Sequence, residues 1–236
     1  MKTKKNPRVS SSVNIQVPQG WKALTPPILR YICALLSSEI FAIDEIKTYL
    51  LFKLSGMTRI AFAKAPPIAI ANLFPELDWM DKSPDYPVRL PELHGCSAVD
   101  AELHGVTFED YLCLENLYQG YVRFMSPAAL NDMATILYPG LAHRLDDVDR
   151  YSIFLWMVGL KAHFSKMFPD LFKPVSGKNS DEEPDMRQIM ISEIRALTGG
   201  DITKEKTVLQ SDTWTALTEL NEKSREYQEQ KRKYKK

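Results

Sequence analysis

"RYSIFLWMVGLKAHFSKMF", residues 150–168, is the stretch that decides the fold. Its apolar side chains return every three or four residues and cover much of a helical circumference. A helix that is apolar on most of its sides needs neighbours on most of its sides. We therefore expect a helix at the centre of the core, with Asp149 as its N-cap.

Helical signals lie on both sides of this central segment. Thr25 is followed by prolines that suit a first turn, and a second helix is predicted over residues 43–55, with a glycine just past its end. Thr107 and Asp110 resemble a capping box, and Ser126 followed by proline marks another helix start. The sequence therefore predicts a mainly α protein with a multi-helix domain.

Residues 58–106 have a different pattern, because prolines recur through them and "RIAFA", residues 59–63, alternates rather than following a helical repeat. We expect a small mixed α/β insertion with short strands and one short helix near residues 69–73.

These patterns divide the chain into four parts. Residues 1–20 are expected to be a flexible basic tail with at most a short strand at "NIQV", and residues 21–172 a mainly helical body that contains the mixed segment. Residues 173–185, "KPVSGKNSDEEPD", are polar and rich in turn formers, which predicts a linker. Residues 186–236 then form a C-terminal helical hairpin module.

Composition limits the function classes. Thirty Lys and Arg balance thirty Asp and Glu, so no overall charge steers the chain to nucleic acid or to an anionic membrane. No apolar run reaches the roughly 20 residues of a membrane span, and no signal peptide is evident. Three cysteines without CxxC spacing suit a reducing compartment. We therefore expect a soluble intracellular protein.

The stretch "LTGGD", residues 197–201, contains two adjacent glycines and an acid, but it lacks the spacing of a dinucleotide fingerprint or a P-loop. Gly199 can end a helix in the left-handed conformation, Gly200 can continue the turn, and Asp201 can cap the start of the next helix. We interpret these three residues as a structural joint between helices.

Candidate metal and catalytic residues are weak. His94, Cys96, His104 and Cys113 supply zinc-type ligands, but their spacing matches no common zinc pattern, and Cys113 is expected on the apolar side of its helix. No nucleophile elbow or catalytic triad pattern is present. We therefore expect no enzyme activity, no bound metal and no cofactor.

Aromatic residues gather on the helix that starts after Thr107. Tyr111, Tyr118, Tyr121 and Phe124 recur at helical spacing, which is more typical of a core face than of a base-stacking surface. We expect them in the core.

The last helix has an unusual seam. Leu217, Leu220, Tyr227 and Tyr234 form a narrow apolar edge with coiled-coil spacing, whereas a core helix usually has a broader apolar stripe. The candidate partner-binding residues are Trp214, Leu217, Leu220 and Tyr227. Such an edge favours a docking helix for a protein partner or for another copy of the chain. A solvated helix end without a partner is the competing interpretation.

Several segments of the chain carry a family resemblance. They are "GWKALTPPILRYICALL", "ELHGVTFEDYLCLENLYQGY", "YSIFLWMVGLKAHFSKMFPDLF" and "IRALTGGDITKEKTVLQSDTWTALTELNEKSRE". Together they resemble an uncharacterised family encoded in phages and prophages of Bacteroidetes. The last segment is similar to the C-terminal part of proteins encoded near tail tape-measure genes, which are thought to act as tail assembly chaperones.

The resemblance implies a noncatalytic protein that binds a long helical partner, such as the tape-measure protein, and protects its apolar surface in the host cytoplasm. The alternative is a nucleic-acid-associated phage or mobile-element protein, in which "MKTKK" at residues 1–5 and "KRKYKK" at residues 231–236 contact phosphate. Self-association also stays open.

Overall fold

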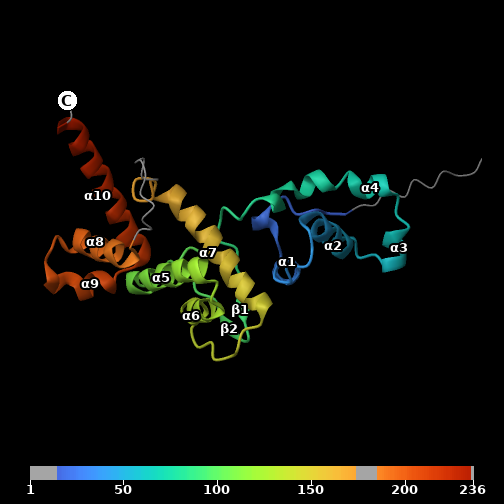
Figure 1. Ribbon diagram of the computed structural model, residues 1–236, viewed down its shortest axis with the longest axis horizontal. Coiled ribbons are helices and arrows are strands. Elements are labelled where there is room, and N and C mark those ends of the chain that lie inside the picture. Colours follow the sequence, from blue (N-terminus) through green and yellow to red (C-terminus); the bar gives the residue numbers. More distant parts are fainter. Residues whose placement is uncertain (1–14, 174–184, 235–236) are drawn as a thin grey trace, which may run out of the picture.

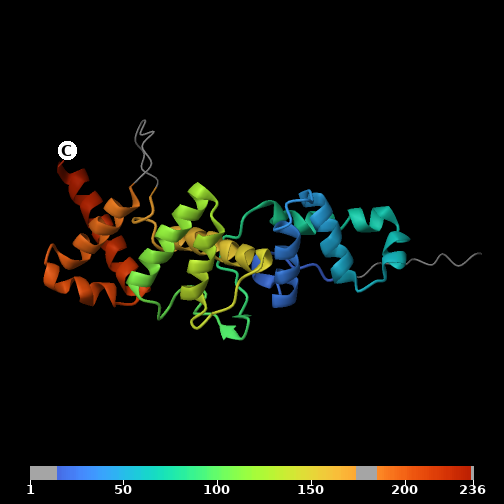
Figure 2. The same ribbon diagram turned by 60° about the horizontal axis from the view of Figure 1, so that its bottom comes forward.

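The computed structural model describes residues 15–173 and 185–234. The chain is mainly helical and elongated, and three groups of helices follow one another along its long axis (Figure 1). Helices α1 to α4 lie at one end, α5 to α7 with a two-stranded sheet lie in the middle, and α8 to α10 lie at the other end (Figure 2). The expected mainly α class with a small sheet is confirmed.

The N-terminal group has its own apolar core. Ile32 of α1, Leu50 and Leu51 of α2 and Leu77 of η2 are fully buried in it. Its elements are η1 (Trp21–Ala23), α1 (Pro26–Leu36), α2 (Ile43–Ser55), α3 (Arg59–Ala63), α4 (Pro67–Ala71) and η2 (Phe74–Asp81). Helices α1 and α2 confirm two of the predicted helices.

Two predictions for this half of the chain are wrong. Residues 15–20 are not part of a loose tail, because Ile15 and Val17 are buried in the N-terminal core, although without strand pairing; residues 1–14 lie outside the described part. "RIAFA" is helix α3, because Thr58 caps it by accepting the Ala61 N–H. Local capping therefore outweighs the alternating pattern.

The central group is built around α7 (Asp147–Met167). Trp156 and Met157 are fully buried, which confirms α7 as a core helix. At Gly159 an added Cβ would stand 2.1 Å from the carbonyl oxygen of Tyr86. Glycine therefore allows the backbone at Tyr86 and Pro87 to pass directly against α7. The other elements are β1 (Glu92–Leu93), antiparallel to β2 (Cys96–Ser97), α5 (Phe108–Phe124) and α6 (Pro127–Leu137).

The start of α7 differs from the prediction by one helical turn. Asp146 is the N-cap, and its carboxylate accepts the Asp149 N–H at 2.7 Å. Asp149 lies inside the first turn and is fully buried. Both residues are acids that suit a helix start, so the sequence alone does not show which of them is the N-cap.

The C-terminal group comprises α8 (Met186–Thr198), η3 (Ile202–Lys204), α9 (Glu205–Leu209) and α10 (Thr213–Tyr234). It is joined to the start of α5 by backbone hydrogen bonds from Phe108 to Ser211 at 2.8 Å and from Thr213 to Val106 at 2.9 Å. Leu217 and Leu220 belong to the same apolar cluster as α5, α6 and α7. The expected hairpin module therefore shares the central core instead of forming a separate one.

The linker predicted over residues 173–185 lies outside the described residues except for its two end positions. No helix in residues 15–173 and 185–234 is long and apolar enough to span a membrane.

Candidate partner-binding groove

The first part of the predicted docking edge on α10, from Trp214 to Leu220, is covered by the chain itself, so it is not a free partner surface. Leu217 is 0% exposed and Leu220 is 3% exposed. Trp214 is half-buried, with its ring 4.6 Å from that of His104 and 5.2 Å from that of Phe168. The narrow stripe is sufficient to hold α10 in place, because α10 lies against a body whose aromatic side chains fill the remaining space.

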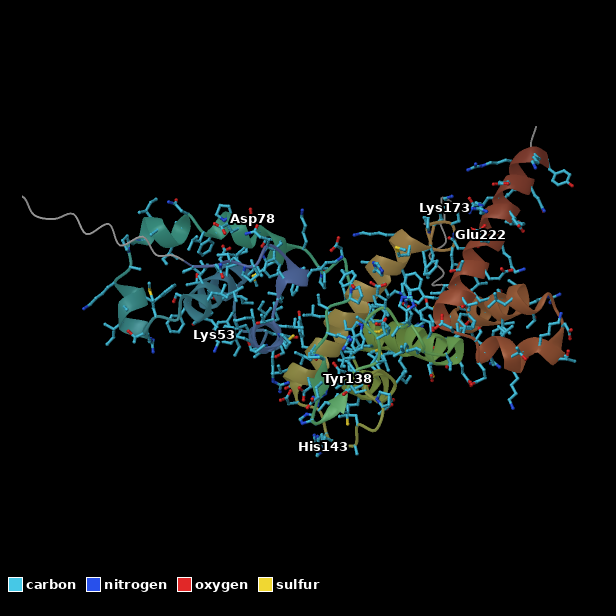
Figure 3. The ribbon with its side chains drawn as sticks, turned by 180° about the vertical axis from the view of Figure 1, so that it is seen from behind. Lys53, Asp78, Tyr138, His143, Lys173 and Glu222 are labelled. Atoms are coloured by element: carbon cyan, nitrogen blue, oxygen red, sulfur yellow. The ribbon has the colours of Figure 1, made fainter. Side chains whose placement is uncertain are left out.

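Polar contacts hold the turns of α10 that follow Leu220 against the segment after α7. Asn221 Oδ1 accepts the N–H groups of Asp170 and Leu171 at 2.9 and 3.1 Å, just beyond the end of α7. Lys173 Nζ donates to Gln228 Oε1 at 2.9 Å. Figure 3 labels Lys173 and, on α10, Glu222. Of the proposed seam, Tyr227 and Tyr234 are well exposed, at 65% and 90%.

The glycine joint forms as the sequence predicts. Gly199 ends α8 at φ 64°, in the left-handed region, and its N–H donates to the Arg195 carbonyl. Gly200 follows at φ 84° and also donates to Arg195, at 3.2 Å. Asp201 accepts the Thr203 N–H at 3.0 Å, although it caps the short η3 rather than an α-helix.

The four candidate zinc ligands are dispersed. His94 Nε2 lies 2.8 Å from Asp149 Oδ2, His104 stacks on Trp214, and Cys96 is in β2. Cys113 is exposed on α5, so its expected burial is wrong. Within the described residues, no three His, Cys, Asp or Glu side chains are arranged to hold a metal ion.

An open groove lies between α5 and α8, beside α7, and sequence patterns alone do not reveal it. Its volume is about 1240 Å³. Two walls come from helices far apart in the sequence, since α5 ends at Phe124 and α8 begins at Met186. Its apolar lining side chains are Tyr111, Leu112, Val122, Phe124, Phe172, Met186, Ile189 and Met190.

The α5 wall of the groove exposes large apolar side chains. Phe124 is 70% exposed and Val122 is 51% exposed, at the last turn of α5. Phe124 was expected in the core, and the structure contradicts this because the side chain is exposed at the last residue of α5. Exposed neighbours of this size are typical of interaction surfaces.

Polar side chains also line the groove. Glu115 of α5 is buried, and its Oε2 lies 2.5 Å from Lys161 Nζ of α7. Glu193 of α8 also lines the groove, and no described residue gives its carboxylate a hydrogen bond or an ion pair within 4 Å. Burial, followed by repulsion from Glu115, raises the pKa of Glu193 from 4.5 to about 7, while Lys161 opposes the shift. The groove therefore combines apolar walls with one unpaired carboxyl group.

Comparison with known protein families, with curated proteins and with solved structures finds no match for this chain. The role of the groove therefore has to be inferred from its own residues.

Proposed function

We propose that this protein is a noncatalytic interaction protein of the phage tail assembly chaperone type, acting in the cytoplasm of a bacterial host. Its task is to bind a helical partner, of which the tape-measure protein is the specific candidate. This assignment gives the protein no catalytic residue and no cofactor. The observation that carries it is the open groove between α5 and α8, with Phe124 and Val122 exposed on its wall.

The groove suits an amphipathic helix for physical reasons. A helix with its side chains is about 10 Å wide, and it buries an apolar stripe when it lies in a groove with apolar walls. Phe124 and Val122 are exposed to water in the free chain, and their burial under a partner helix would contribute favourable free energy. A long helical protein that awaits assembly offers many such stripes, which agrees with the family resemblance.

Co-expression with a phage tape-measure protein tests the proposal. We expect the two proteins to co-purify, and we expect Phe124→Asp combined with Val122→Asp to reduce capture by more than about tenfold, because charges would then face the apolar stripe. Tyr227→Asp is the matched control, since Tyr227 is similarly exposed but lies on α10 outside the groove. Loss of capture in the control, or full capture by the double variant, would contradict the proposal.

Salt dependence distinguishes the nucleic-acid alternative from the protein-binding function. Lys231, Arg232 and Lys233 form the exposed basic end of α10. Binding of about six phosphates would weaken by a factor of roughly 10³ between about 50 and 200 mM salt, whereas apolar helix capture responds little. Neighbouring basic residues on α10 already pair with acids, as Lys223 does with Glu219 at 3.0 Å. This local neutralisation favours the protein-binding function.

A further inference from the structure

Three acids and three bases from the described part of the chain line the groove, but none of these bases pairs with Glu193. Glu115 and Lys161 lie across the groove from Glu193. Lys161 is already engaged, because its Nζ lies 2.5 Å from Glu115 Oε2 and 5.4 Å from the centre of the Tyr118 ring. Among the described residues, the Glu193 carboxyl group therefore has no cation within 4 Å.

An unpaired carboxyl group between apolar walls is costly for the free protein. Removing a carboxylate from water is unfavourable unless hydrogen bonds or an opposite charge compensate for it. Glu193 lies one turn after Ile189 and Met190 on the α8 wall, and both of these apolar side chains also line the groove. A ligand that brings a cation to this position would remove the cost.

The other charged groups around Glu193 define where that cation fits. Across the groove, α5 contributes Glu115 and the buried phenol of Tyr111, and α7 contributes Lys161. At the end of the groove, the start of α8 contributes Asp185 and Arg187, and the last turn of α5 contributes Arg123. Around Glu193 itself, two carboxyl groups therefore face one ammonium group.

We propose that the groove selects a partner helix with a lysine or arginine in the middle of its apolar stripe, and that this cation pairs with Glu193. This inference rests on the proposed function. The long aliphatic stem of lysine or arginine can cross the apolar wall and deliver the charge at its tip. A helix with an uninterrupted apolar stripe would bury Glu193 without compensation, so the groove would reject it.

This pairing makes capture depend on pH. The pKa of Glu193 in the free protein is raised to about 7 by burial and by Glu115, with Lys161 in opposition. Pairing favours the ionised carboxylate, so binding releases a proton, and affinity rises as the pH rises through about 7. From about pH 6 to pH 8 the ionised fraction of Glu193 increases about tenfold, and affinity should follow.

The test compares affinity for the tape-measure protein at about pH 6 and pH 8 in wild type, Glu193→Gln and Glu219→Gln. Glu219 is an exposed acid of α10, so its variant removes the same charge outside the groove. We expect wild type and Glu219→Gln to bind about tenfold more tightly at the higher pH. Glu193→Gln should lose this dependence and bind more weakly than wild type at the higher pH. Equal affinity of Glu193→Gln and wild type there, or an unchanged pH dependence, would overturn the inference.

Peptides that tile the tape-measure protein provide a second measurement. The best-binding peptide should contain a basic residue within its apolar stripe, and its replacement by methionine should abolish the pH dependence. A best-binding peptide without such a residue overturns the inference but leaves the proposed function intact. Failure of wild type to capture the tape-measure protein at either pH overturns both.

Discussion

Glu193 illustrates at the residue scale how a group with a proposed binding role can weaken the free fold. Its pKa in the folded chain is about 7 against an ordinary value of 4.5, because burial and Glu115 disfavour the charge. Between these two values the unfolded chain has already lost the proton and the folded chain has not. Stability therefore falls as the pH rises from 4.5 to about 7.

Replacement of Glu193 by glutamine should remove this loss. We expect Glu193→Gln to stabilise the protein by about 1–3 kcal/mol at about pH 8 and to have little effect near pH 4.5, as measured by urea unfolding. Glu219→Gln should give no comparable gain at either pH, because Glu219 is exposed. A gain in acid as large as that in base would contradict the assigned pKa.

At the scale of elements, α10 shows how much burial a short apolar stripe can achieve. Leu217 fills a closed core position, while Tyr227, about three turns closer to the C-terminus, faces solvent. Both side chains lie on the seam that the sequence identifies, so their difference comes from the neighbouring helices and not from their spacing.

Truncation of the two side chains measures this difference. Leu217→Ala should cost about 2–5 kcal/mol because it leaves a cavity in a close-packed core, whereas Tyr227→Ala should change stability by less than about 1 kcal/mol. Urea unfolding of the two variants checks the prediction. A cost below about 1 kcal/mol for Leu217→Ala would return the α10 edge to the candidate partner surfaces.

Sequence reasoning predicts the longer helices because their signals are local. α1 has prolines after Thr25, α5 has Thr107 and Asp110, and the central helix has an apolar repeat on most sides. The same reasoning misses α3 as a helix, because five residues are too few for a helical repeat to be distinguished from alternation.

The candidate groove could be recognised only from the tertiary structure. Phe124 looks like a core residue in its own helix, and Glu193 looks like a surface acid in α8. Only the packing of α8 near α5 makes the first a wall of the groove and the second an unpaired group within it. The signal that the sequence offered was the acid itself, which interrupts the apolar residues of α8.

At the scale of the whole molecule, two apolar cores are joined through α1 and α7. Arg30 of α1 donates to the buried Asp149 of α7 at 2.6 Å, and His94 lies 2.8 Å from the other carboxylate oxygen. Burial alone would raise the pKa of Asp149, but these hydrogen bonds outweigh it and hold the pKa below 3.8. Asp149 therefore stays charged between the two cores.

Loss of the arginine should weaken this junction. Arg30→Met leaves the Asp149 carboxylate without its main cation and should destabilise the protein by about 1–3 kcal/mol at about pH 7. Because the folded pKa of Asp149 is lowered, its contribution is present above pH 3.8 and is lost as the pH falls through the folded pKa, so the difference should shrink in acid. Thermal unfolding at several pH values measures it.

The exposed pair of Lys166 and Asp85 is the control for that variant. Lys166→Met should change stability by no more than about 0.5 kcal/mol at any pH. Equal effects of Arg30→Met and Lys166→Met at neutral pH would show that the junction does not depend on the buried ion pair.

The late position of Leu217 and Leu220 in the chain has a consequence for biosynthesis. Residues 15–81 include an apolar core that can close while the ribosome is still translating, but the central core lacks these two leucines until α10 has emerged. The groove wall on α8 is anchored only when α10 docks against it and the start of α5. A nascent chain therefore cannot present a finished groove until Leu217 and Leu220 have left the exit tunnel, and the proposed partner could be captured only after that point.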